Sequence, residues 1–189
     1  MIYTQIPVIL VAYAYSVEEA GIFAISVTFA TIFLLPSAVF TKAFSPILYE
    51  EANKSKKLHY RIVVNFLFAL ACIGLLMGIG LYFLSEFMVT NFLDKNFISS
   101  VTLIKVLSVF IFARYLNTAI SYSMYTHNFS AAHAKILFVA ILLQLTFFYL
   151  SANFSMFNLN QVAWMMCAIE FLIFFITLGF LKSTAFKLT

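Results

Sequence analysis

The sequence predicts an all-α membrane protein, a bundle of about six transmembrane helices with almost no soluble part. Two observations predict this class: 64% of the residues are hydrophobic and only 10% are charged, and the apolar residues gather in long runs. Soluble domains carry roughly 25% charged residues, because their surfaces face water. With 24 Phe residues and a mean hydropathy of +1.03, this chain suits lipid as its solvent.

Six apolar runs approach the roughly 20 residues that a helix needs to cross about 30 Å of hydrocarbon. Inside lipid each backbone group needs a partner within the protein, and the runs are too uniformly apolar for barrel strands, so helices are expected. They form a single bundle over residues 1–189. The predicted spans are residues 2–15, 22–49, 62–84, 101–122, 136–150 and 162–181.

The connections between the spans alternate in charge, which predicts the orientation of the chain. An excess of Lys or Arg is found in segments 50–61 and 123–135 and in the C-terminal tail. The other three connections, at residues 16–20, 85–100 and 152–161, have no such excess. Basic residues are retained on the cytoplasmic side of a membrane protein. We therefore expect an even number of spans, with both termini in the cytoplasm and the chain in the inner (plasma) membrane.

Several other classes of function are not expected. The net charge of +4 comes mostly from residues just beyond apolar runs, which indicates topology rather than nucleic-acid binding. No HExxH, GxSxG, Walker or GxGxxG pattern is present, so we expect neither enzyme activity nor a cofactor. Cys72 and Cys167 lie inside apolar runs, and His59, His127 and His133 lie in or beside predicted cytoplasmic connections. We interpret the cysteines as small apolar residues and the histidines as solvated side chains, not as metal ligands.

Four ionisable residues, Lys42, Lys105, Arg114 and Glu170, lie within predicted spans. A charge at the centre of a bilayer costs about 2.5 kcal/mol or more, so such residues usually face the bundle interior. Lys105 is one turn from the start of its span and can extend to the membrane surface. Lys42 is within two turns of the cytoplasmic end, so for it a surface position and a cavity position both stay open.

Arg114 lies about two turns from either end of its span and belongs to a polar stripe. Arg114, Asn117, Thr118 and Ser121 are spaced i, i+3, i+4 and i+7, which places them on one face of a helix. Lipid would reject such a stripe. We expect it to face a cavity or a neighbouring helix, and we take these residues, with Lys42, as the candidate substrate-binding residues.

Glu170, in the middle of the last span, has two interpretations. It is either half of a structural ion pair, with Arg114 or Lys42 as its partner, or a protonatable group that couples transport to an ion gradient. The first interpretation requires the last span to lie beside the span that carries Arg114.

The second span contains a helix-breaking feature. Pro36 lies in its predicted interior, where a missing N–H and a clash with the preceding turn predict a kink, and therefore a candidate hinge. Broken helices with polar stripes occur at transporter cavities, although a static kink stays an alternative. In the third span, Gly74 and Gly78 form a GxxxG pattern that predicts close approach of another helix.

The chain resembles the polysaccharide flippases of the MOP superfamily, the Wzx-type O-antigen and capsule translocases. The residues that carry the resemblance are Glu18-Glu19-Ala20-Gly21-Ile22-Phe23, then Pro36-Ser37-Ala38 and Phe44-Ser45-Pro46, with Glu170 in the last span. The resemblance implies translocation of an undecaprenyl-diphosphate-linked oligosaccharide to the periplasmic leaflet by alternating access. It also implies that Arg114 and Lys42 meet the diphosphate or acidic sugars.

Two departures from the family pattern bear on partners. The family has twelve or more helices, so this chain corresponds to a C-terminal half. The family's "LIP…G…GAA" run before the last helix is replaced by residues 152–157. The expected partners are therefore the lipid-linked oligosaccharide, membrane lipids, and either a missing N-terminal half or a second copy. A MATE-like drug or ion antiporter, and a non-transporting membrane subunit or truncated remnant, stay open as alternative functions.

Overall fold

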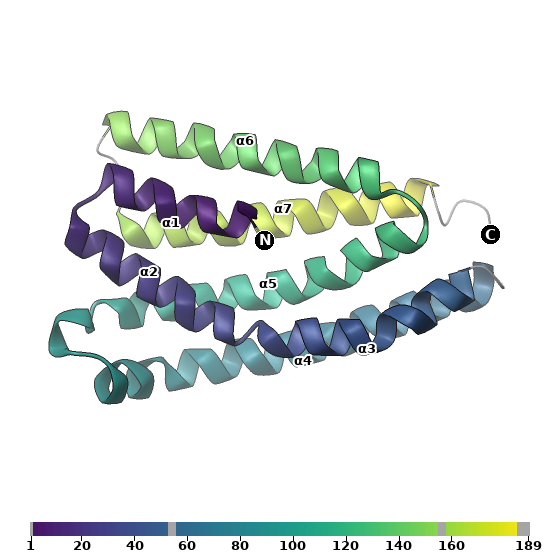
Figure 1. The fold of residues 1–189 in the computed structure, drawn as a ribbon, viewed down its shortest axis with the longest axis horizontal. Helices are drawn as coiled ribbons and strands as arrows, with labels where there is room; N and C mark the ends of the chain where they lie inside the picture. Colours follow the sequence, from purple (N-terminus) through teal and green to yellow (C-terminus); the bar gives the residue numbers. More distant parts are fainter. Residues whose placement is uncertain (1, 53–55, 155–157, 185–189) are drawn as a thin grey trace.

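A computed structural model shows an elongated bundle of helices that run roughly parallel to one another (Figure 1). It describes residues 2–52, 56–154 and 158–184. In these ranges there is no strand, and every long element is an α-helix. The helices are α1 (Ile2–Ala14), α2 (Val17–Ile32), α3 (Leu35–Ala52), α4 (Lys56–Phe92), α5 (Ser100–Thr126), α6 (Ser130–Phe154) and α7 (Leu159–Thr184), with a short 3₁₀ helix at Lys95–Phe97.

The predicted class, an all-α multi-pass membrane bundle, is confirmed. Within the described ranges, five spans are long and apolar enough to cross a membrane, with α2 and α3 together forming one of them. The predicted first span is the exception, because α1 has 13 residues and is therefore only about 20 Å long. Large apolar side chains such as Phe68, Phe83 and Phe175 are exposed on the outer surface, as lipid contact requires.

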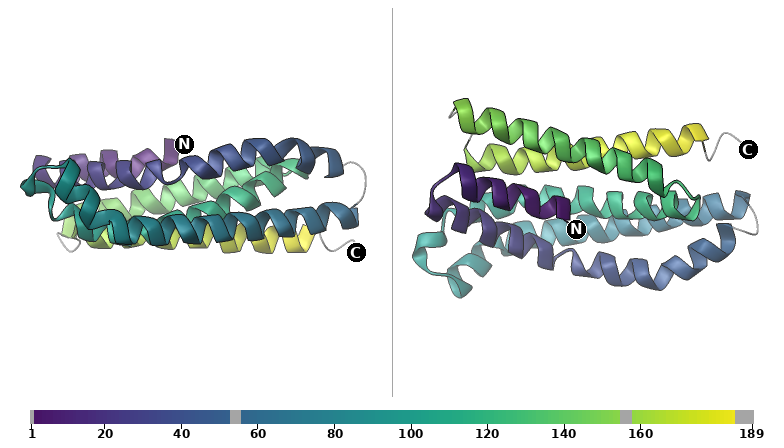
Figure 2. Two further views of the ribbon diagram at one scale, coloured as in Figure 1. Left: turned by 90° about the horizontal axis from the view of Figure 1, so that it is seen from below. Right: turned by 45° about the horizontal axis from the view of Figure 1, so that its top comes forward.

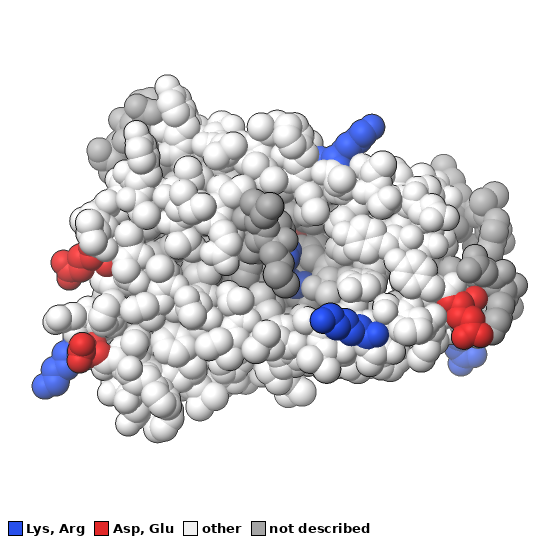
Figure 3. Space-filling view, in the orientation of Figure 1, with Lys and Arg blue, Asp and Glu red and all other residues white. Residues whose placement is uncertain are grey.

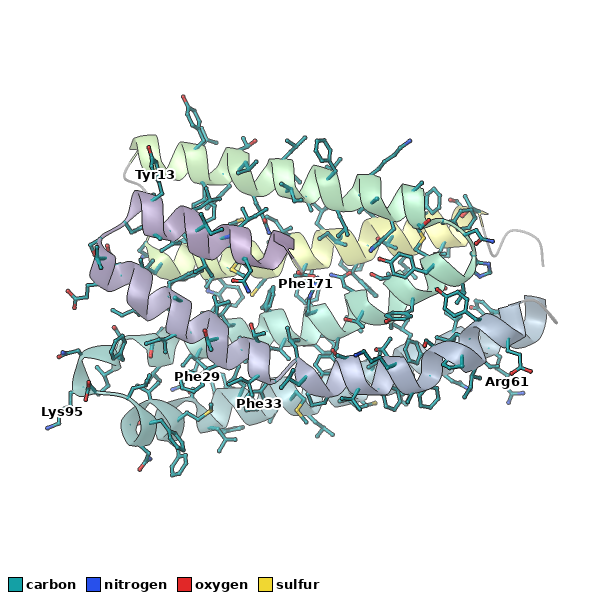
Figure 4. The ribbon with its side chains drawn as sticks, in the orientation of Figure 1. Tyr13, Phe29, Phe33, Arg61, Lys95 and Phe171 are labelled. Atoms are coloured by element: carbon teal, nitrogen blue, oxygen red, sulfur yellow. The ribbon has the colours of Figure 1, made fainter. Side chains whose placement is uncertain are left out.

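The connections alternate between the two ends of the bundle, as the predicted topology requires. The α1–α2, α4–α5 and α6–α7 connections lie at one end, and the α5–α6 connection and the end of α7 lie at the other (Figures 1 and 2). Figure 4 shows Arg61 and Lys95 at opposite ends. The most basic part of the α3–α4 connection, with Lys54, and the tail with Lys187 lie outside the described residues.

Helix α5 is the centre of the fold. It packs against α2, α3, α4, α6 and α7, and it is far more buried than the other spans. The predicted close approach at the GxxxG pattern is confirmed, because a Cβ added at Gly74 would lie 2.6 Å from the Cβ of Tyr115 on α5. One added at Gly78 would lie 2.9 Å from the backbone oxygen of Ser108. The two glycines therefore let α4 lie directly on α5.

The span predicted at 22–49 is two helices, not one kinked helix. Helix α2 begins at Val17, because Ser16 and Glu19 form a capping box that satisfies its first amides. It ends at Ile32, and α3 begins three residues later, at Leu35. Pro36 therefore lies in the first turn of α3, where its missing N–H leaves no helical hydrogen bond unmade. The position predicted as an interior kink is a break between helices.

The third predicted span also ends later than expected. Residues 62–84 were predicted, but α4 continues to Phe92. Only residues 93–99 form the connection to α5, and they contain the 3₁₀ helix. The late end places the acidic and basic residues of this connection, including Lys95, at one end of the bundle.

Candidate functional site

The polar stripe predicted on the fourth span lines a cavity. Arg114, Asn117, Thr118 and Ser121 all border a space of about 300 Å³ between α5, α6 and α7. Tyr122 and Tyr125 extend this wall toward the end of α5, and α6 and α7 supply the opposite wall. The remaining lining residues are His133, Leu137 and Ile173. Figure 3, drawn in the orientation of Figure 1, shows a hollow in the middle of the visible surface, with atoms of basic residues at its bottom. The expectation that the stripe faces a cavity or a neighbouring helix is therefore confirmed.

An ion pair closes the inner end of this cavity. Arg114 Nη1 lies 3.3 Å from Glu170 Oε1, with the Glu170 side chain 1% exposed and that of Arg114 22% exposed. The pair joins α5 to α7, so the two helices are neighbours as the structural interpretation of Glu170 required. Each charge neutralises the other where hydrocarbon would otherwise surround it. Of the two partners considered for Glu170, the structure selects Arg114.

Asn117 adds a second link between α5 and α7, through the same Glu170. Its Nδ2 donates a 2.7 Å hydrogen bond to the backbone oxygen of Glu170 and another to the carboxylate oxygen Oε2. The carboxylate thus accepts from both a guanidinium and an amide, which fixes its position. Hydrogen bonds to charged groups are stronger than those between neutral groups, so this cluster sets the relative position of α5 and α7.

The other two stripe residues keep acceptor capacity. Thr118 Oγ1 donates to the backbone oxygen of Arg114 at 2.9 Å, and Ser121 Oγ donates to that of Asn117 at 2.6 Å. A hydroxyl has one proton and two lone pairs. Both hydroxyl protons are donated to backbone oxygens of α5. Toward any further group, the hydroxyl oxygens of Thr118 and Ser121 can therefore act only as hydrogen-bond acceptors.

Lys42 and Lys105 are not part of the cavity wall. Lys42 is exposed on α3, because Ser37 and Thr41 occupy the inward face and the next residue is turned about 100° away from it. Lys42 is therefore outside the Arg114 cavity, as its interpretation as a surface lysine requires. Lys105 lies 5.6 Å from the ring centre of Tyr82, a cation–π distance.

Sequence reasoning missed His133. It was interpreted as a solvated residue of a connection, but α6 begins at Ser130 and His133 is 3% exposed in its first turn. The signal that could have found it is its spacing from Leu137. The two residues are four apart, on one helix face, and both line the cavity.

The break before Pro36 is tied to the same part of α5. Ser37 donates its amide to Leu34 at 3.1 Å, so the carbonyl of Phe33 lacks its usual helical donor. Tyr115 Oη donates to that carbonyl at 2.9 Å and is itself fully buried. The residue next to Arg114 therefore holds the α2–α3 break closed.

Metal-binding clusters and other cavities are the further kinds of site to consider in the described part of the chain. No group of three His, Cys, Asp or Glu side chains there could hold a metal ion. A second hollow of about 340 Å³ between α1, α2 and the start of α3 carries no charged residue among its described lining. The cavity at Arg114, by contrast, combines space with a residue of the Arg114–Glu170 ion pair.

The fold and this site together define a multi-pass α-helical membrane protein with a polar, charge-containing cavity inside the bundle. Comparisons with known proteins add no family to that class. No protein-family model, no curated protein and no solved structure matches the chain.

Proposed function

We propose that this chain is part of a transporter that moves a lipid-linked oligosaccharide, of the undecaprenyl-diphosphate type, across the inner membrane. The observation that carries the proposal is the Arg114 cavity: a buried polar wall on the central helix, opening between helices of a bundle. Membrane helices rarely keep such residues unless they line a substrate path or pair with one another. The resemblance to the MOP-type flippases supplies the substrate class.

The position of the cavity supports the direction of transport. Its wall runs from Arg114, halfway along α5, to Tyr125 near the end of that helix. This end also holds the α5–α6 connection and the end of α7 (Figure 1), and the positive-inside rule assigns it to the cytoplasm. A cavity open on that side receives substrates that are assembled in the cytoplasm.

The α2–α3 break supports a moving part. Broken helices in transporters allow one section of a helix to move without unfolding the other. Here Tyr115 on α5 donates a side-chain hydrogen bond to the Phe33 carbonyl at the break, and Ser37 Oγ donates another to the backbone oxygen of Leu34. The described helices form one wall of an alternating-access cavity, so the proposal includes a second wall, from an N-terminal half or from a second copy.

The test is complementation of a host that lacks its own flippase for surface polysaccharide. The chain is expressed with its N-terminal half, where the upstream DNA encodes one, and alone otherwise. Arg114→Ala is expected to abolish surface polysaccharide, whereas Lys42→Ala, which alters an exposed lysine of similar charge, is expected to leave it intact. Absence of polysaccharide with the unaltered protein would overturn the proposal.

A second candidate function, a MATE-like ion or drug antiporter, rests on Glu170. A buried carboxylate inside a bundle is the usual coupling group of such proteins. In that case Glu170→Gln abolishes transport of the drug or ion, and Arg114→Ala only weakens it. If neither variant changes any transport and both change only the amount of folded protein, the chain is a non-transporting subunit.

A further inference from the structure

The outer half of the cavity has an aromatic wall that the predicted stripe does not include. The ring centres of Tyr125 and His133 are 5.4 Å apart with an interplanar angle of 87°, and those of Tyr122 and Tyr125 are 6.0 Å apart at 75°. Two helices supply this wall, α5 at its last turns and α6 at its first. All three residues border the same space as Arg114.

Two buried polar atoms of the cavity residues lack hydrogen-bond partners. They are Nδ1 of His133, in a side chain 3% exposed, and Oδ1 of Asn117, in a side chain 2% exposed. Native proteins pair nearly all buried polar atoms, and an exception often marks the position of a bound group. The two orphaned atoms belong to opposite walls of one cavity, so a single bound molecule can approach both after small side-chain rotations.

The charges at the cavity argue against a diphosphate as that molecule. Arg114 is already paired with Glu170 at 3.3 Å, so the two charges cancel. An ionised phosphate offers only acceptor oxygens. It can satisfy a donor on His133, but it cannot satisfy Oδ1 of Asn117 or the hydroxyl oxygens of Thr118 and Ser121, which need a donor.

A sugar ring matches these groups better. Each of its hydroxyls both donates and accepts, so it can serve orphaned acceptors and a histidine nitrogen together. Its apolar ring faces suit contact with aromatic side chains such as Tyr125. The volume of about 300 Å³ is at the small end of the range for ligand pockets and suits one sugar ring rather than a whole lipid-linked head group.

We propose that this cavity binds a single sugar ring of the transported glycan, between His133 on α6 and the α5 wall with Asn117 and Tyr125, and that the diphosphate lies outside it. The proposal rests on the proposed function and assigns that function's site to the carbohydrate. His133 is then a specificity-determining residue, because it contacts the sugar.

The experiment measures binding without transport. The full chain is purified in nanodiscs, and saturation-transfer difference NMR is recorded with glucose, galactose, N-acetylglucosamine and glucuronate at millimolar concentration. Inorganic pyrophosphate is tested in parallel by ³¹P line broadening. At least one sugar is expected to receive saturation from the protein. Pyrophosphate binding is expected to be unaffected by substitutions in the cavity.

Two variants test His133 directly. His133→Gln removes the ring, and His133→Phe keeps its shape while removing both nitrogens, so one of them preserves the packing. Both are expected to weaken sugar binding roughly five-fold or more, the effect of losing one hydrogen bond in a buried site. His127→Gln is the matched control, because His127 is close in sequence but is not among the lining residues. It is expected to bind like the unaltered chain.

Any of three results overturns this inference. The first is the absence of saturation transfer to any sugar, which means that water fills the cavity. The second is equal sugar binding by His133→Gln, His133→Phe and the unaltered chain, and the third is pyrophosphate binding that depends on His133.

The complementation assay separates these results from failure of the proposed function. A chain that supports polysaccharide export without binding sugars here retains the function and loses this site. One that binds sugars here without supporting export has a carbohydrate site and a different function.

Discussion

Arg114 and Glu170 are in a position where neither charge is stable alone. The Glu170 side chain is 1% exposed and accepts from both Arg114 and Asn117, whereas Arg114 is 22% exposed and borders the cavity. Removing one partner leaves the other as an uncompensated charge inside the membrane. The more deeply buried of the two, Glu170, suffers more from that loss.

This asymmetry predicts the order of stabilities of three variants. Arg114→Gln is expected to destabilise the folded chain by about 3 kcal/mol, and Glu170→Gln by less, because the arginine that it leaves unpaired reaches the cavity. The double variant is expected to be more stable than Arg114→Gln alone. Thermal unfolding in detergent, followed by circular dichroism, measures all three. Additive losses in the double variant would contradict a direct pair.

The close packing of α4 on α5 at its glycines leads to a second prediction for single residues. Gly74→Ala places a methyl group 2.6 Å from the Cβ of Tyr115, so α4 must move away from α5, at a cost of about 1–3 kcal/mol. Gly80→Ala is the matched control on the same helix, since its nearest neighbour is a Phe33 ring atom at 3.8 Å. The control is expected to be neutral or slightly stabilising, because Ala favours helix over Gly. Equal melting temperatures for the two variants would show that the helices do not pack at Gly74.

Single residues also show what the sequence could and could not predict about the site. The i, i+3, i+4, i+7 spacing was enough to place Arg114, Asn117, Thr118 and Ser121 on one cavity wall. Spacing within one helix says nothing about the facing helices, so it could not decide whether Arg114 or Lys42 is the partner of Glu170. His133 was missed because the start of its helix was placed six residues too late, at 136 instead of 130.

At the scale of helices, the break between α2 and α3 is connected to the helix that carries Arg114. The carbonyl of Phe33 has lost its helical donor, and Tyr115 on α5 replaces it at 2.9 Å. Because Tyr115 follows Arg114 in α5, any rotation of this helix around the cavity also pulls on the break. The sequence predicted a disruption at Pro36, but the donor that closes it comes from a residue 82 positions away in the chain.

Removal of that donor is expected to loosen the break. Tyr115→Phe keeps the ring in place over Gly74 but leaves the Phe33 carbonyl without a partner, a loss of about 1–3 kcal/mol. Hydrogen–deuterium exchange of peptides covering residues 30–40 is expected to speed up, while exchange in α7 stays unchanged. The control Tyr149→Phe, on the exposed face of α6, leaves both regions unaltered. Faster exchange throughout the bundle would mean that Tyr115 supports the whole core and not the break.

For the whole molecule, the order of the five long spans in the described residues followed from hydropathy, because each span must satisfy its own backbone in lipid. Their arrangement did not follow, because lipid-facing and core-facing residues in these helices are nearly equally apolar. Helix α5 is central because small and polar residues let other helices pack closely against it, as at Ser108, whose backbone lies against Gly78. The packing role of such residues is evident only when the neighbouring helix is known. The observed ends of helices differ from the predicted ones where a cap starts a helix early, as at Ser16, or where a helix continues beyond its apolar run, as at Phe92.

The orientation of the bundle is the remaining prediction, and it decides from which side the cavity is filled. Two exposed serines mark the two ends: Ser99 precedes α5, and Ser130 begins α6. Ser→Cys changes little in size, so Ser99→Cys and Ser130→Cys, each with Cys72 and Cys167 replaced by Ala, form a matched pair. In intact cells with a permeable outer envelope, a membrane-impermeant maleimide is expected to label Cys at 99 and to label Cys at 130 only after lysis. Labelling of position 130 from outside would mean that the positive-inside rule fails here. The cavity at Arg114, His133 and Tyr125 would then open away from the cytoplasm, and a substrate made there could not enter it in this conformation.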